Sequence, residues 1–184
     1  MIGYTVSMEK MVVIDTKKNA FFDSFYNLLA QSFPNDEIRP YERQKDLLQI
    51  ENYRAYVQWD DHRMVGLITV WLFPGFSFIE HFAVAPELRS QGIGSRILQE
   101  TLSLLPKPVI LEAELPETAL AQRRLAFYAR HGFHENPYFY VQPAYSADRN
   151  SVPMRLLSTN PLSERDFVTV RTEIYRQVYH VETE

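Results

Sequence analysis

The sequence predicts an α/β fold of the α+β type, with a mixed antiparallel and parallel central sheet flanked by helices. Two observations predict it. Residues 53–84 form three segments rich in alternating apolar residues and separated by turn residues, which is typical of an antiparallel meander. From residue 85 to residue 141, helical spacing alternates with short apolar segments, which predicts an α/β layer. The 184 residues show no domain boundary, so we expect a single domain over residues 1–184.

Two helices are expected ahead of the meander. Asn19 is placed to cap the first, which ends near Ser32, before Pro34. Residues 34–40 are polar and predict a loop, and residues 41–51 predict a second, short helix. The meander then follows, with strands at 53–59, 64–73 and 76–84 and turns at 60–62 and Pro74-Gly75.

The second half of the chain alternates between helices and strands. Apolar residues recur at helical spacing from Ile93 to Leu105, and a short apolar strand is expected at 109–113. The next helix begins at Glu117 or Thr118 and stops at Gly132, the usual C-terminal cap position. The remaining elements are a strand at 133–141, a loop at 142–153, a strand at 152–158 and a helix from Ser163, with Asp166 completing a variant capping box, to about residue 180.

Composition excludes several classes of function. Apolar residues make up 46% of the chain and charged residues 23%, which is ordinary for a globular domain. The net charge of −4 supplies no field that would gather nucleic acid or anionic lipid, so neither is expected as a partner. Cysteine is absent, which excludes thiol nucleophiles and thiolate metal sites and suits a cytoplasmic location. No segment has the roughly 20 apolar residues of a membrane span.

A pair of glycines predicts a phosphate site. Gly92 and Gly94 lie between a strand and the first turn of a helix, where glycine permits a positive φ and the helix N-terminus offers unpaired N–H groups. Arg89 and Arg96 add cationic donors. The alternative is a loop that merely needs tight turns. A dinucleotide fingerprint would need glycine where Ile97 stands, and no P-loop motif is present.

Two motifs resemble those of the GNAT N-acetyltransferase superfamily. Residues 89–94, Arg-Ser-Gln-Gly-Ile-Gly, closely resemble motif A, Q/R-x-x-G-x-G/A, and residues 84–89 fit the V-x-P-x-x-R spacing around it. Residues 126–133, AFYARHGF, resemble motif B, typically F-Y-x-x-x-G-F. The resemblance covers about residues 11–141, and the family's mixed sheet agrees with the predicted order of elements. The resemblance includes no motif in the C-terminal strand and helix, at about residues 152–180.

The resemblance implies acetyl-CoA as co-substrate and assigns roles by position. Tyr128 would lie near the thioester sulfur and protonate the leaving thiolate. The alternative is that Tyr128 is an aromatic residue of the core without a catalytic role. Backbone groups of Phe82, Ala83 and Val84 would pair with the pantetheine arm as an added strand does. The diphosphate would be held by Arg89 and by the backbone amides of Gln91, Gly92, Ile93, Gly94 and Ser95.

Glu80 is the candidate general base. By period two it shares a strand face with apolar residues, namely Phe76, Phe78, Phe82 and Val84. A carboxylate in an apolar row is either paired or has a raised pKa, and a raised pKa suits a group that takes a proton from an amine. Some members of the superfamily place a glutamate on the equivalent strand for this purpose. The alternative is a structural ion pair, for example with an arginine. His81, expected on the other face, is a weaker candidate.

The chain departs from the family at Ala121, where many relatives carry an asparagine that contacts the cofactor. Arg123 or Arg124 could replace that contact, although a solvated helix surface is the favoured interpretation. No histidine and carboxylate cluster predicts a metal. The aromatic residues are expected in the core, with some in an acceptor pocket, and they are Trp71, Phe73, Tyr138, Phe139, Tyr140 and Tyr145.

The expected function is transfer of the acetyl group of acetyl-CoA to a primary amine by direct attack in a ternary complex, because no cysteine exists to form an acyl-enzyme. The developing oxyanion would be held by a strand amide near Val84. The acceptor is expected to be a small-molecule or peptide amine of undetermined identity. The sequence does not determine the oligomeric state, and a homodimer is one of the alternatives. The alternative is an acyl-CoA-binding sensor on the same scaffold, which needs the glycine cradle but neither Glu80 nor Tyr128.

Overall fold

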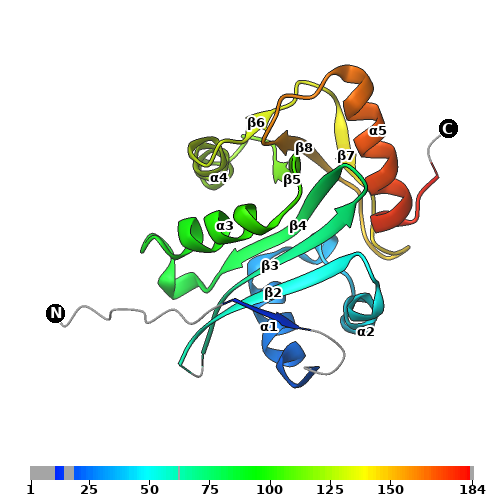
Figure 1. Cartoon of the computed structure of the whole chain (residues 1–184). Coiled ribbons are helices and arrows are strands. Elements are labelled where there is room, and N and C mark those ends of the chain that lie inside the picture. Colours follow the sequence, from blue (N-terminus) through cyan, green and yellow to red (C-terminus); the bar gives the residue numbers. More distant parts are fainter. Residues whose placement is uncertain (1–10, 15–18, 62, 183–184) are drawn as a thin grey trace.

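A computed structural model describes residues 11–14, 19–61 and 63–182, which form a mixed eight-stranded sheet with helices on both faces (Figure 1). The strand order is β1-β2-β3-β4-β5-β8-β6, and β7 also pairs with β8. The pair β4–β5 is parallel and the other pairs are antiparallel. The predicted fold class is therefore confirmed. The strands are β1 (Val12–Ile14), β2 (Tyr53–Asp60), β3 (Arg63–Phe73), β4 (Phe76–Val84), β5 (Val109–Glu114), β6 (His134–Glu135), β7 (Tyr140–Gln142) and β8 (Val152–Ser158).

The helices divide between the two faces of the sheet. Apolar residues of α1, the turn after α2 and α5 pack into one core cluster, and those of α3 and α4 pack into a second cluster on the opposite face. The α-helices are α1 (Phe22–Ser32), α2 (Tyr41–Asp46), α3 (Ile93–Leu104), α4 (Ala119–Arg130) and α5 (Glu164–Ile174). Shorter helical turns are η1 (Asn19–Phe21), η2 (Asn35–Glu37), η3 (Leu47–Gln49), η4 (Pro86–Leu88) and η5 (Tyr175–Tyr179).

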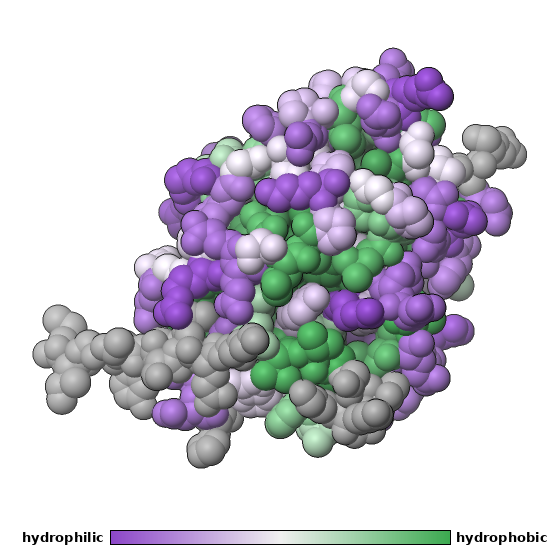
Figure 2. Space-filling model, viewed as in Figure 1, coloured by the Kyte–Doolittle hydropathy of each residue, from purple (hydrophilic) through white to green (hydrophobic). Residues whose placement is uncertain are grey.

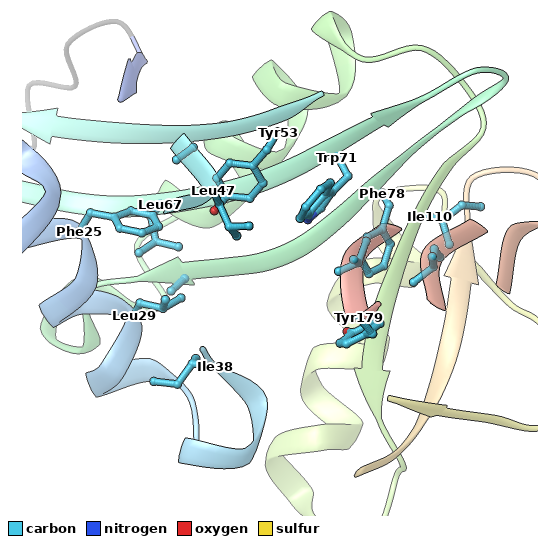
Figure 3. Packing of buried hydrophobic residues seen from close by; sticks show 14 of the residues in the cluster. Phe25, Leu29, Ile38, Leu47, Tyr53, Leu67, Trp71, Phe78, Ile110 and Tyr179 are labelled. Carbon is cyan, nitrogen blue, oxygen red and sulfur yellow. The ribbon is translucent and has the colours of Figure 1, made fainter. Parts of the chain in front are cut away.

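The first core cluster is built from large side chains that meet across one face of the sheet. Figure 3 shows Phe25 and Leu29 of α1 and Tyr179 of η5 on the same side of the strands as Trp71 and Phe78. These side chains are at most 6% exposed, so the face is sealed from water. On the outer surface, hydrophilic residues cover the helices, while apolar residues remain visible over the strands between them (Figure 2).

Several predicted helix ends are confirmed. The Thr118 hydroxyl accepts a hydrogen bond from the Ala121 N–H at 3.0 Å and so caps α4. The Ser163 hydroxyl caps α5 in the same way. Gly132, with φ of 83°, ends α4 in a Schellman motif, because its N–H and that of Phe133 return to carbonyls of the last helical turn. These caps fix where the α4 side chains lie relative to the sheet.

Other boundaries differ from the sequence-based expectation. Asn19 begins a single 3-10 turn and does not cap α1, whose N-cap residue Phe21 makes no side-chain cap bond. The helix expected over 41–51 ends at Asp46 and continues as a 3-10 turn. Strand β1 was missed, since its three residues carry too little periodicity. His62 of the predicted 60–62 turn, like residues 1–10, 15–18 and 183–184 of the expected domain, lies outside the described residues.

The strand expected over 133–141 is interrupted. Its residues form two short strands, β6 and β7, on either side of residues 136–139. The Asn136 side chain donates hydrogen bonds to the Leu156 carbonyl at 3.0 Å and to the Ser158 hydroxyl at 2.9 Å. The next residue, Pro137, has no N–H to give to a strand ladder. The chain therefore leaves the sheet there, and Phe139, expected in the core, is 79% exposed.

Helix α3 lies unusually close to β3 at Gly66. A Cβ built on Gly66 would lie 2.4 Å from Cδ1 of Ile97 and 3.1 Å from the Ala83 carbonyl oxygen. Ile97 is fully buried, so its side chain has little room to move. Gly66 therefore permits the contact that holds α3 against the sheet.

We predict that Gly66→Ala lowers the free energy of unfolding by about 1–3 kcal/mol through overpacking. Ile97→Val removes the obstructing Cδ1 and alone costs about 0.5–1.5 kcal/mol. The double variant should lose clearly less stability than the sum of the two single variants, measured by urea unfolding. Strict additivity would show that α3 is not pressed against Gly66.

Candidate functional site

The loop between η4 and α3 presents a concave run of backbone N–H groups, here called the nest (residues 90–95). Ser90 and Gly92 adopt left-handed conformations two residues apart, with φ of 64° and 81°. Gly92 is the N-cap residue of α3 and has no side chain, so no side-chain hydrogen bond caps the first turn of this helix. The N–H groups in the first turn of a helix have no partners within the helix. A Cβ on Gly92 would have no atom within 4 Å, and Ser90, Gly92, Gly94 and Ser95 line a surface groove, so the nest is accessible to an anion.

A groove of about 520 Å³ runs from the nest to α4. Arginine side chains stay charged at all physiological pH values, so the four that line the groove make it positive. Apolar side chains of β4 and α4 line the remainder. The groove therefore suits a ligand that combines phosphates with an apolar arm. Its lining residues are Phe82, Val84, Arg89, Ser90, Gly92, Gly94, Ser95, Leu120, Arg123, Arg124, Phe127, Tyr128 and Arg130.

Strands β4 and β5 separate beside this groove. They pair only over Ser77–Ile79 of β4 and Val109–Leu111 of β5. Beyond Ile79, β4 keeps its hydrogen-bonded partner β3 but has no pairing with β5. The second edge of β4 at residues 82–84 is therefore available to an extended ligand. The Arg89 Nε donates a hydrogen bond to the Val84 carbonyl at 3.1 Å, which holds the loop before the nest against this edge.

The other residues predicted for this region, Ala83, Gln91 and Ile93, are not among those that line the groove. Ala83 and Ile93 turn their side chains into the core, where they are 6% and 3% exposed. The Gln91 side chain returns to the Glu87 carbonyl at 3.3 Å. The cofactor role predicted for these residues concerns their backbone groups, which do not depend on where the side chains lie, and it stays a prediction.

Tyr128 lies in the last turn of α4, where the Schellman motif holds its carbonyl through the Phe133 N–H at 3.1 Å. Its ring is half-buried and packs edge-on against Phe127 and Phe133, with centroids 5.4 and 5.8 Å away. Burial raises the pKa of its phenol to about 12. The phenol is therefore protonated at neutral pH and can give a proton or a hydrogen bond.

A second, narrow pocket of about 50 Å³ opens where β4 and β5 part, and we call it the acidic pocket. It shares Phe82, Arg124 and Tyr128 with the groove, so the two spaces adjoin at these three residues. Its volume admits a small group such as an ammonium, not a whole substrate. Its further lining residues are Phe33, Glu37, Ile79, Glu80, His81, Leu111, Glu112, Ala113, Glu114, Gln142 and Met154.

A β-bulge corrects part of the predicted face of Glu80: Phe82 and Val84 do not share it, and His81 is not opposite to Glu80. The β3–β4 register shifts between Thr69 and Val70, which pair with His81 and Ile79, so that Glu80 is an additional residue on β4. Period two therefore breaks there. Phe76 and Phe78 belong to the cluster under α1, whereas Phe82 and Val84 belong to the cluster under α3 and α4. Glu80 and His81 both reach the segment between α1 and α2, through Arg39 and the Glu37 carbonyl.

The Glu80 carboxylate is fully enclosed by donors. Oε1 accepts from Arg39 Nη1 at 2.5 Å and from the Tyr145 hydroxyl at 2.9 Å, and Oε2 accepts from Trp71 Nε1 at 2.9 Å. Burial alone would raise the pKa of Glu80, but the Arg39 guanidinium and the hydrogen bonds from Trp71 and Arg39 outweigh it and hold the pKa below the ordinary value. The base role of Glu80 stays a prediction. Its contacts are those of the alternative, a structural ion pair with an arginine.

His81 is held neutral and structural. Its Nε2 lies 2.9 Å from the Glu37 carbonyl oxygen and its Nδ1 lies 3.3 Å from the Thr69 hydroxyl. Burial lowers the pKa of His81 below its ordinary value. A neutral ring that donates to the Glu37 carbonyl satisfies both nitrogens, and the side chain then has no free proton-accepting atom.

Sequence analysis missed three acidic residues of the pocket, Glu37, Glu112 and Glu114. Glu112 accepts hydrogen bonds from the Tyr140 and Tyr179 hydroxyls, and burial raises its pKa to about 8. Glu114 accepts from Arg124 Nη1 at 2.5 Å. The signal for two of them was present, because glutamates at alternate positions of a short apolar strand predict a polar site on one face.

Arg124 does not lie on a solvated helix surface, as the favoured interpretation had it. Its side chain pairs with Glu114 on β5 and lines both the groove and the acidic pocket. Arg123 lines the groove and is exposed, in agreement with the predicted helix surface. Helix numbering alone does not show which of two adjacent arginines faces the sheet when the helix's apolar stripe is narrow.

We predict that Arg39→Met lowers the free energy of unfolding by about 3–5 kcal/mol at pH 7, because it leaves the Glu80 charge buried without its partner. The folded-state pKa of Glu80 is lowered, so its stabilising contribution exists above its ordinary pKa and is lost as the pH falls. Without Arg39, protonation at low pH relieves the buried charge. The loss should therefore be smaller at pH 4 than at pH 7 in urea unfolding.

The matched control is Arg43→Met on the exposed surface of α2, which should change stability by less than about 0.5 kcal/mol at either pH. An equal loss for Arg39→Met at pH 4 and pH 7 would show that the ion pair is not the source of the effect.

Among the residues that the structure describes, no group of three or more His, Cys, Asp or Glu side chains is arranged to hold a metal ion. Within the same residues, none of the helices combines the length and apolar character needed to cross a bilayer.

Comparison with known proteins places this arrangement in a family. The model of the acetyltransferase (GNAT) family matches residues 22–133. A Bacteroides thetaiotaomicron protein described as a GNAT-family acetyltransferase is 34% identical, with a TM-score of 0.87 over 95% of this chain and 100% of its own. More distant structures share the fold at 15% and 17% identity. They are a GNAT acetyltransferase from Elizabethkingia anophelis with acetyl-CoA bound (TM-score 0.59; 84% of this chain, 98% of its own) and the ribosomal-protein-S18-alanine N-acetyltransferase from Escherichia coli (TM-score 0.61; 84% and 96%).

The family match spans both motifs and the strands between them, and the glycine nest, the parted strands and Tyr128 lie within it. The chain belongs to the GNAT acetyltransferase family, and it is an acetyltransferase.

Proposed function

We propose that this acetyltransferase moves the acetyl group of acetyl-CoA to a primary amine by direct attack in a ternary complex. One observation carries the proposal: the basic groove and the acidic pocket meet at Tyr128. A ligand with phosphates suits the first space and an ammonium group suits the second. The two reacting groups would then approach one another beside a phenol that holds its proton at neutral pH.

Acetyl-CoA fits the groove by its chemistry. The nest would hold the diphosphate on the N–H groups of residues 91–95, and the groove arginines would neutralise its remaining charge. The pantetheine arm, which carries amide groups, would pair with the free edge of β4 at residues 82–84. The bound molecule supplies a thioester carbonyl. A solved structure with the same fold contains acetyl-CoA, which supports this assignment.

The chain's own residues would manage charge and protons. The Val84 N–H lies on the strand edge beside the groove and would stabilise the oxyanion that forms when the amine attacks the carbonyl carbon. As the C–S bond breaks, the Tyr128 hydroxyl would give its proton to the sulfur. The attacking nitrogen must lose a proton, and the acidic pocket is where an acceptor for it would lie.

The acceptor is proposed to be a small-molecule or peptide amine. The acidic pocket supports a cationic end group, because carboxyl oxygens of four glutamates line it and can accept hydrogen bonds from an ammonium. Glu80 and Glu114 are each paired with an arginine, so the charge that attracts the ammonium comes mainly from Glu37. The Escherichia coli neighbour is named for N-acetylation of an alanine, which supports an amine acceptor at the level of the shared fold.

We predict that Gly92→Val raises the dissociation constant for acetyl-CoA at least about tenfold, or about 1.4 kcal/mol, in isothermal titration calorimetry. A β-branched residue cannot adopt the left-handed φ of 81° without strain, so the nest would deform. Gly75→Val is the matched control, because Gly75 has a φ of 99° but lies in the β3–β4 turn outside the groove. Unchanged affinity of Gly92→Val would rule out the nest as the diphosphate site.

We predict that Tyr128→Phe lowers kcat roughly 100-fold while the dissociation constant for acetyl-CoA changes less than about threefold. The ring and its packing remain, and only the proton donor is lost. Thiol release with acetyl-CoA and a panel of primary amines measures the effect. Tyr56→Phe, which removes a phenol outside both spaces, is the control.

Equal turnover in Tyr128→Phe would remove the acid role from Tyr128. Tight binding of acetyl-CoA without transfer to any amine of a broad panel would favour the acyl-CoA sensor instead.

A further inference from the structure

Glu37 differs from the other three carboxylates of the acidic pocket. Glu80, Glu112 and Glu114 each accept a hydrogen bond from an arginine or tyrosine side chain. Within residues 11–14, 19–61 and 63–182, the Glu37 carboxylate has no hydrogen-bond or ion-pair partner, although the residue is only 9% exposed. A nearly buried carboxylate with no protein partner that faces a pocket is available to a ligand.

The backbone around Glu37 is firmly held. The Glu37 N–H donates to the Pro34 carbonyl at 3.0 Å, and the Glu37 carbonyl oxygen lies 2.9 Å from His81 Nε2 on β4. The preceding Asp36 carbonyl accepts from the Gln142 side chain at 3.1 Å. Two residues later, Arg39 is tied to Glu80. The segment therefore presents the Glu37 carboxylate from a fixed position, as a reacting group requires.

The charges around Glu37 favour proton uptake near neutrality. Burial, followed by repulsion from Glu114, raises its pKa to about 7, and the attraction of Arg124 only partly offsets them. Asp36 adds a further raising effect. The other titratable groups lining the pocket are Glu80, His81, Glu112 and Tyr128. Glu80 is ionised and paired, His81 is neutral, and Glu112 and Tyr128 hold their protons at pH 7.

Because it lies free in the pocket that meets the acetyl-CoA groove at Tyr128, we propose that Glu37 accepts the proton from the acceptor's ammonium group and so generates the nucleophilic amine. This assignment rests on the function proposed above. The other pocket carboxylates are occupied: Glu114 is paired with Arg124, Glu112 is held by two tyrosines and Glu80 is sealed by three donors.

The protons and bonds balance. The ammonium gives one proton to Glu37, which passes it to water. The nitrogen lone pair then forms the C–N bond with the carbonyl carbon, and the C–S bond breaks. The tetrahedral adduct releases a second proton from nitrogen, and this proton restores the Tyr128 phenol after Tyr128 has protonated the sulfur. The products are an amide, the free thiol of coenzyme A and one proton in solution. Glu80 acts in this scheme as a positioning residue, because through Arg39 it holds the segment that carries Glu37.

The experiment is the pH dependence of kcat/KM for the intact enzyme with acetyl-CoA and three probe amines: butylamine, 1,4-diaminobutane and a peptide with a free N-terminus. In the unmodified enzyme, kcat/KM should rise as the pH passes through about 7, since Glu37 must be ionised to take the proton. In Glu37→Gln, kcat should fall roughly 100-fold at pH 7.5 and that rise should vanish. The acetyl-CoA dissociation constant should stay within about threefold, which reports an intact fold and groove.

Two further variants separate catalysis from structure. Glu37→Asp keeps a carboxylate and should retain part of the activity and the rise near neutral pH. Glu42→Gln, on the exposed surface of α2 and outside both spaces, should match the unmodified enzyme. If Glu37→Gln turns over any probe amine within about threefold of the unmodified rate, the assignment to Glu37 is wrong while the proposed function stands.

The assignment to Glu37 is also wrong if the rise near pH 7 survives in Glu37→Gln and is lost in Glu80→Gln, which would return the base role to Glu80. If the unmodified enzyme binds acetyl-CoA and acetylates no amine, the proposed function fails, and the assignment falls with it.

Discussion

The buried ion pair between Arg39 and Glu80 is the interaction on which the site depends. Arg39 Nη1 lies 2.5 Å from Glu80 Oε1 on β4, Nη2 donates to the Val178 carbonyl at 2.7 Å, and the guanidinium carbon lies 4.2 Å from the centre of the Tyr145 ring. One side chain thereby joins the segment after α1, the middle of the sheet and the C-terminal helix. A buried pair of this kind contributes less to net stability than its Coulomb attraction suggests, but neither partner can be removed alone. It fixes the geometry of the pocket wall.

The bulge at Glu80 explains how one strand serves two spaces. Before it, β4 pairs with β5 and packs its phenylalanines under α1 and α5. After it, the alternation is offset by one residue, so Phe82 and Val84 turn toward α3 and α4 and line the groove. Pairing with β5 stops at the same point. The opened edge therefore separates a basic space, suited to phosphates, from an acidic space, suited to an ammonium, and leaves Tyr128 between them.

The backbone conformation of the nest could be predicted from the sequence because its signal is local, whereas the role of Tyr128 follows from the resemblance of residues 126–133 to motif B and stays a prediction. Gly92 at a helix start and Gly132 at a helix end follow directly from the backbone conformations that these positions require. The alternation after Glu80 could not be predicted, since a bulge adds a residue without leaving a mark in the apolar pattern of β4. Glu37 lies in a polar loop where an acidic residue is ordinary. Only contacts with His81 and Gln142, distant in sequence, place it in the pocket wall.

The most direct test of this account is a structure of the complex with acetyl-CoA. We expect the diphosphate on the N–H groups of the nest, and the thioester sulfur within hydrogen-bond distance of the Tyr128 hydroxyl. The acetyl carbonyl would face the acidic pocket, and the pantetheine arm would run along residues 82–84. A diphosphate bound elsewhere, or a thioester remote from Tyr128, would contradict it.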